Sequence, residues 1–193
     1  MKNFKSIIVV KHPVDRIWQT VRDRLPELVP LVDDIESITV IERKTSEKGK
    51  VRLLNQWRSR QRVPVFLQPK LGADAIGWLD RNEWDDRTRS CTWQIEPSVF
   101  RDYISCRGTT SYEPAMAGRG TRVTFQGGFN LAPGALRGVA GPLEQVLGTF
   151  VESMVTTMIP KNFRKVLEAA SELIRTGGYS PPGTGGVAAP SSR

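Results

Sequence analysis

Residues 143–174 read LEQVLGTFVESMVTTMIPKNFRKVLEAASELI, with apolar side chains at steps of mostly three or four. This spacing places the apolar side chains on one face of a helix, so it predicts a long helix with one broad buried stripe. The stripe consists of Leu143, Leu147, Phe150, Met154, Met158, Val166, Ala170 and Leu173. Pro160 predicts a kink or break near residues 156–159, because proline removes a backbone hydrogen bond from a helix.

Four segments upstream of this helix alternate apolar and polar residues, as half-buried strands do. They cover residues 75–84, 89–96, 102–112 and 121–131. If Asp86 and Arg87 form a two-residue hairpin loop, Asp80 lies opposite Trp93, and the next turns place Ile104 opposite Phe129. That register separates apolar from charged side chains across all four strands, which predicts an antiparallel meander with one buried face. The buried face holds Trp78, Trp84, Cys91, Trp93, Ile95, Ile104, Cys106, Tyr112, Val123, Phe125, Phe129 and Leu131.

The first part of the chain adds three strands and two short helices to this pattern. The strands are expected at residues 4–11, 35–43 and 51–58. A helix is expected to begin at His12-Pro13-Val14-Asp15, because proline suits the first turn and aspartate favours its positive end. Its buried stripe is expected to contain Ile17, Trp18 and Val21, and residues 27–32 form at most a second small helix. The chain therefore belongs to the α+β class.

The composition is that of one globular domain. The chain has 193 residues, of which 39% are hydrophobic and 25% charged, enough to bury a core without disulfides or metals. We assign the domain to residues 1–176, and the Pro/Gly/Ser-rich residues 177–193 are expected to be a disordered tail. The four consecutive apolar residues at 7–10 are too few for a signal peptide or a membrane span, so a cytoplasmic protein is expected.

The two cysteines and the single histidine leave little room for metal or redox chemistry. Cys91 and Cys106 belong to no CxxC motif or Cys/His cluster, so neither a metal site nor a cofactor is expected. The predicted register makes them diagonal neighbours, which disfavours a relaxed disulfide and predicts two free buried thiols. His12 is expected to be a capping or surface residue.

Three segments resemble the START-like (SRPBCC) superfamily, which includes the birch-pollen-allergen fold, polyketide cyclases and coenzyme-Q-binding proteins. These segments are Ile8-Val-Val-Lys-His-Pro-Val-Asp-Arg-Ile-Trp18, Asn82-Glu-Trp-Asp85 and Phe125-Gln-Gly-Gly-Phe129. The resemblance spans about residues 3–175, and residues 63–69 and 77–84 look closest to uncharacterised bacterial branches. It implies a helix-grip fold, in which a curved antiparallel sheet of about seven strands wraps a long C-terminal helix, with two short helices after the first strand. It also implies an apolar cavity between sheet and helix. Members of this superfamily bind or carry lipids, sterols, quinones or polyketides, and a minority catalyse reactions.

The aromatic and methionine side chains of the predicted inner face favour a hydrophobic ligand over any other partner. We therefore expect a cavity that binds, sequesters or transfers a lipid, quinone or polyketide-like molecule, with Asp80 and Asn82 orienting its polar end. Gly127, predicted opposite Cys106, would widen the cavity by withholding a side chain. Alternatively, the aromatic side chains fill the core and the polar groups lie at its wet rim. The candidate ligand-binding residues are Trp57, Trp78, Asp80, Asn82, Trp84, Trp93, Cys106, Tyr112, Phe125, Phe129, Phe150 and Met154.

A polyketide cyclase/dehydrase-like enzyme is the second hypothesis, with Asp80 or Tyr112 transferring protons. Binding without catalysis is favoured, because a catalytic carboxylate needs a partner and the predicted register turns Arg107 away from Asp80. We therefore assign no catalytic residue from the sequence.

The net charge of +8 and the pI near 9.9 attract polyanions, whether nucleic acid or an anionic membrane surface, but a solvated surface with an alkaline pI is the leading explanation. Arg58, Arg60 and Arg62 precede the apolar loop that contains Phe66 and Leu67. These five residues are expected to dock peripherally on an anionic membrane, although a solvated strand end and a loop folded over the cavity would give the same pattern. A protein-interaction module that uses the basic surface is the third hypothesis. Nucleic acid is disfavoured, because the aromatic residues lie on the predicted inner face and are not interleaved with the arginines.

Overall fold

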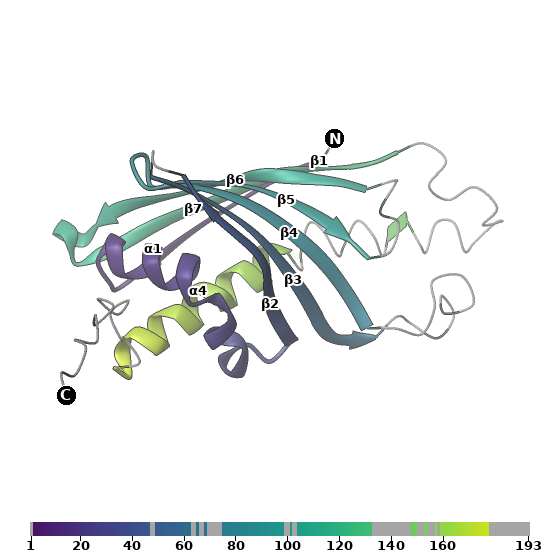
Figure 1. The fold of residues 1–193 in the computed structure, drawn as a ribbon, viewed down its shortest axis with the longest axis horizontal. Coiled ribbons are helices and arrows are strands. Elements are labelled where there is room, and N and C mark those ends of the chain that lie inside the picture. The colour runs from purple at the N-terminus through teal and green to yellow at the C-terminus, as the bar shows by residue number, and fades with distance from the viewer. Residues whose placement is uncertain are drawn as a thin grey trace, which may run out of the picture.

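Seven antiparallel strands form one sheet, in the order β1-β7-β6-β5-β4-β3-β2. The computed structural model describes residues 2–46, 49–62, 65, 68, 75–98, 101, 104–132, 148–149, 153, 157 and 159–177. The strands are β1 (Lys2–Val10), β2 (Ile35–Thr45), β3 (Lys50–Arg62), β4 (Ala75–Asp85), β5 (Ser90–Pro97), β6 (Ile104–Ala115) and β7 (Gly120–Leu131). Figure 1 shows the sheet curving over the helices α1 (Val14–Asp23) and α4 (Ile159–Arg175). This is the predicted helix-grip α+β fold.

The helices cover the concave face of the sheet. α1 and the 3-10 helix η1 (Leu25–Leu31) follow β1, as the sequence predicts, and a short turn, η3 (Met116–Gly118), joins β6 to β7. Ile17 and Trp18 of α1 are fully buried. None of the described helices is long and apolar enough to cross a membrane.

The C-terminal helix α4 is held to the rest of the domain by both apolar and charged contacts. Val166, Leu167 and Ala170 belong to the buried core, and Lys165 forms an ion pair with Asp34 in the turn before β2. The described part of α4 begins at Ile159, one residue before Pro160, and the kink predicted at residues 156–159 falls partly outside the described residues. Most of the predicted upstream helix, including Leu143, Leu147, Phe150, Met154 and Met158, lies outside the described residues, as do residues 178–193.

The predicted register of the meander is wrong by two residues at each turn. The β4–β5 turn has four residues, 86–89, so Asp85 pairs with Ser90 and Asn82 lies opposite Trp93. The Asp85 carboxylate accepts hydrogen bonds from the backbone N–H groups of Arg87 (2.9 Å) and Thr88 (3.3 Å), a pattern that stabilises such turns.

The same offset continues across the sheet, where Ile95 pairs with Cys106 and Cys106 pairs with Phe129. The predicted pairs of Asp80 with Trp93 and of Ile104 with Phe129 are therefore wrong. Because a shift of two residues preserves the face on which a side chain points, the predicted division into inner and outer faces survives.

Candidate functional site

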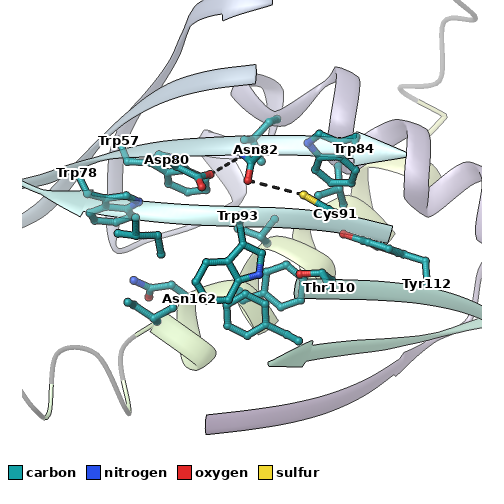
Figure 2. A pocket seen from close by; sticks show the side chains of 17 residues that line it. Trp57, Trp78, Asp80, Asn82, Trp84, Cys91, Trp93, Thr110, Tyr112 and Asn162 are labelled. Atoms are coloured by element: carbon teal, nitrogen blue, oxygen red, sulfur yellow. Dashed lines mark hydrogen bonds between the residues drawn. The ribbon is translucent and has the colours of Figure 1, made fainter. Parts of the chain in front are cut away.

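A partly enclosed cavity of about 100 Å³ lies between the concave face of the sheet and α4. Four of the five tryptophans of the chain line it, on β3, β4 and β5 (Figure 2). The predicted ligand-binding residues that line it are Trp57, Trp78, Asp80, Asn82, Trp84, Trp93, Tyr112 and Phe125. The sequence therefore identified most of the sheet wall.

Four predicted ligand-binding residues do not line this cavity in the described structure. Cys106 lines a second cavity of about 50 Å³, which shares Trp78, Ile95, Ile159 and Asn162 with the first. Phe129 is buried opposite Cys106 in the sheet. Phe150 and Met154 lie outside the described residues.

Stacked aromatic rings occupy much of the space between sheet and helix. The rings of Trp57 and Trp78 are stacked, with centroids 5.4 Å apart and 16° between their planes. Phe125 stacks on Trp93 at 4.8 Å and on Phe163 of α4 at 4.3 Å. These stacks both fill and line the interior, so the predicted alternatives of a solid core and a cavity both hold in part.

Gly127 does not widen the cavity as predicted. It pairs with Gly108 and not with Cys106, and a side chain built on Gly127 would lie 2.4 Å from Cη2 of Trp93. The space that the glycine leaves is therefore occupied by the indole of Trp93.

Three polar groups of the cavity form a short hydrogen-bonded chain on β4 and β5 (Figure 2). The Asn82 amide nitrogen donates a 2.9 Å hydrogen bond to Oδ2 of Asp80. The Cys91 thiol in turn contacts Oδ1 of Asn82 at 3.7 Å, a long, weak hydrogen bond. Asn82 therefore links the carboxyl group of Asp80 to the thiol of Cys91.

Burial raises the pKa of Asp80 to about 6, although contacts with Asn82, Trp57 and Asn55 oppose the shift. Asn55 is fully buried directly opposite Asp80 on β3. The amide atoms of Asn55 and the indole N–H of Trp57 have no hydrogen-bond partner of normal geometry among the described residues. They therefore stabilise the charged form of Asp80 only through longer contacts. The pairing of β3 with β4, which the sequence analysis did not predict, places these two groups near Asp80.

The other titratable groups of the interior stay protonated at neutral pH. Burial raises the pKa of Cys91 and Tyr112 well above their usual values and that of Cys106 to about 12, and the charge of Asp80 raises both cysteine values further. Both thiols are free, as predicted. Among the described residues, no cluster of three or more His, Cys, Asp or Glu is placed to hold a metal ion.

The helices supply cavity residues that the sequence analysis missed. Ile159, Asn162, Phe163 and Val166 of α4 line the cavity, and only Val166 belongs to the predicted stripe. Their spacing of i, i+3, i+4 and i+7 is the signal that would have found them. Val21 and Leu25 of α1 and η1, and Cys91, Ile95 and Thr110 of the sheet, complete the described lining.

The predicted membrane-docking residues are only partly described. Arg58, Arg60 and Arg62 are exposed at the end of β3, and within the described part of the chain none of them forms an ion pair. Phe66 and Leu67 lie outside the described residues.

Comparison of the chain with known proteins identifies its fold. No protein-family model matches the sequence, and no curated protein matches it either. Among solved structures, TTHA0849 from Thermus thermophilus is 20% identical with a TM-score of 0.62, over 92% of this chain and 100% of that one. The ZhuI aromatase/cyclase from Streptomyces sp. R1128 is 12% identical with a TM-score of 0.59, over 92% and 98%. Norcoclaurine synthase from Thalictrum flavum is 15% identical with a TM-score of 0.57, over 90% and 86%. With its seven-stranded sheet closed on α4, the chain has the helix-grip fold and shares it with these solved structures.

Proposed function

We propose that the protein binds a small hydrophobic molecule in the cavity between the sheet and α4, and sequesters or transfers it. The observation that carries the proposal is the make-up of the wall, where four tryptophans and other apolar side chains surround a few polar groups, among them the linked Asp80, Asn82 and Cys91. An apolar pocket with a few convergent polar groups is the usual composition of a small-molecule site.

The size of the cavity limits what enters without rearrangement. An apolar cavity of about 150 Å³ takes up benzene, so a space of about 100 Å³ suits one ring or the end of an alkyl chain. A whole lipid, quinone or polyketide-like molecule would require the half-buried Trp78, which lines both cavities, to move.

Native mass spectrometry of freshly purified protein, followed by organic extraction, tests the proposal. We expect a bound molecule at about one per chain, lost in Ile95→Phe, because Ile95 lines both cavities and the larger ring fills them. Gln94→Phe is the matched control, since Gln94 is exposed on the outer face of the same strand. A chain that stays free of ligand when offered lipid, quinone and polyketide extracts would contradict the proposal.

A cyclase-like enzyme is the second candidate, and one observation favours it. Asp80 faces the cavity, and its pKa of about 6 suits a general acid or base working near neutral pH. The ZhuI aromatase/cyclase shares the fold. A linear poly-β-ketone thioester should then be converted by the wild type and not by Asp80→Asn, while both bind it equally; conversion by both variants would exclude Asp80 as the proton-transfer group.

A further inference from the structure

Asp80 is a cavity carboxyl group that lacks a partner of opposite charge among the described lining residues. Among the described lining residues there is no lysine, arginine or histidine, and Asp80 is the only acid. The charged residues nearest to it along β4, Arg81 and Glu83, face outward, where they pair with Glu96, Lys50 and Arg52. Burial of an unpaired carboxylate costs free energy. A ligand that supplies the missing positive charge would therefore gain binding free energy from Asp80.

The contacts of the carboxyl group leave room for such a ligand. Asn82 donates to Oδ2, and the side chain of Asp80 still has surface in the cavity. Figure 2 shows Trp57 and Trp78 beside Asp80 on the same wall. Tryptophan is the best aromatic partner of a cation, so a carboxylate next to stacked indoles provides both of the usual recognition elements of an organic ammonium group.

We propose that the cavity selects small apolar amines, whose protonated nitrogen binds Asp80 while their hydrocarbon part lies among the tryptophans. This rests on the proposed function and narrows it to a class of ligand. A fatty acid or another carboxylate would place a second negative charge beside Asp80 with no cation to offset it, and the site would reject it for that reason.

The pH dependence of binding follows from the groups that face Asp80. These are Cys91 on β5, Cys106 on β6, and the uncharged Asn55, Asn82 and Asn162 on β3, β4 and α4, while Tyr112 of β6 lines the same cavity. Both thiols and the phenol stay neutral below pH 8, because burial raises their pKa. The pKa of Asp80 is about 6, so amine binding should strengthen from about pH 5 to about pH 8, by about tenfold if only the carboxylate form binds.

Three probes of nearly equal size separate this inference from the proposed function. Benzylamine, benzyl alcohol and benzoate each carry one ring, which suits the cavity, and they differ in charge. Their affinities would be measured at about pH 5 and pH 8 by following the tryptophan indole N–H signals in NMR titrations. We expect benzylamine to bind best at pH 8 and benzoate to bind worst, with benzyl alcohol insensitive to pH.

Asp80→Asn removes the charge and keeps the shape of the side chain. In this variant benzylamine should bind no better than benzyl alcohol, and its pH dependence should disappear. Glu83→Gln is the control, because it changes the net charge equally on the outer face of the same strand and should preserve the preference. Benzoate binding as tightly as benzylamine at pH 8, or a benzylamine affinity independent of pH in the wild type, would overturn the amine preference and leave the hydrophobic site intact. Failure of all three probes to bind would reject both the site and its preference.

Discussion

Gly108 of β6 lies directly opposite Gly127 of β7, and the indole ring of Trp93 lies against both backbones. A Cβ on Gly127 would come within 2.4 Å of Trp93 and 2.8 Å of the Arg107 carbonyl oxygen. Gly127→Ala should therefore lower the free energy of unfolding by about 1–3 kcal/mol, the usual cost of overpacking. Urea denaturation measures this change in the free energy of unfolding, with the exposed Gln126→Ala as control. An unchanged midpoint for Gly127→Ala would show that the ring does not pack as described.

The raised pKa of Asp80 makes the contribution of this one group to folding stability less favourable at neutral than at acid pH. With a folded pKa of about 6 against an ordinary value of 3.8, the folded chain holds the proton more tightly, so the Asp80 contribution to stability falls as pH rises between these values. Asp80→Asn should therefore be more stable than the wild type at pH 7.5, by about 1–3 kcal/mol, and the two should converge near pH 4. Urea denaturation at both pH values measures the difference. A constant gap would show that the variant acts through something other than ionisation.

Asp86 ties the β4–β5 turn to α1. Its carboxylate accepts a 2.7 Å hydrogen bond from the fully buried Trp18 indole and pairs with Arg22. Asp86→Ala should cost about 1–3 kcal/mol, because the indole N–H loses its partner in a dry environment. Thermal unfolding measures the loss of stability in Asp86→Ala, with the exposed Asp33→Ala as the reference variant. Equal stability of the two variants would contradict this role.

Membrane docking is a separate proposal for the basic end of β3. Replacement of Arg58, Arg60 and Arg62 by glutamine should weaken binding to phosphatidylserine vesicles by about 1 kcal/mol per arginine, or roughly a hundredfold in total. The matched control replaces Lys5, Arg107 and Arg122, three basic residues elsewhere on the sheet. Equal loss of vesicle binding in both triple variants would point to general charge attraction and not to a docking site.

The alternation of apolar and polar residues was enough to predict the strands and their faces, because that pattern does not depend on which residues pair across strands. It could not predict the register. The four-residue β4–β5 turn depends on the carboxylate contacts of Asp85 and on Arg89, which adopts a positive φ of 50°, and an alternation pattern contains neither feature.

The same distinction holds for the candidate site. The alternation pattern determines which side chains point inward, and the strand register determines their neighbours. The inward position of Asp80, Asn82 and the tryptophans was predictable from strand periodicity alone. The environment of Asp80 was not predictable from that periodicity, because the position of Asp80 between Asn55 and Ile95 depends on how the strands pair. Phe163 was missed because the predicted stripe contained no residue between Met158 and Val166, although Phe163 lies three residues before Val166 and lines the same cavity.

The position of β1 beside β7 has a consequence for the order of folding. Every other neighbouring pair in the sheet is also consecutive in the chain, whereas Lys2 pairs with Phe129 and Ile8 with Val123. During synthesis β2 to β7 are therefore able to form as successive hairpins, while β1 must wait for the last strand to emerge. Contacts across such a separation are slow to form. Until they do, the edge of β7 stays open to pairing with other chains, so the first strand both completes the sheet and protects the nascent protein from aggregation.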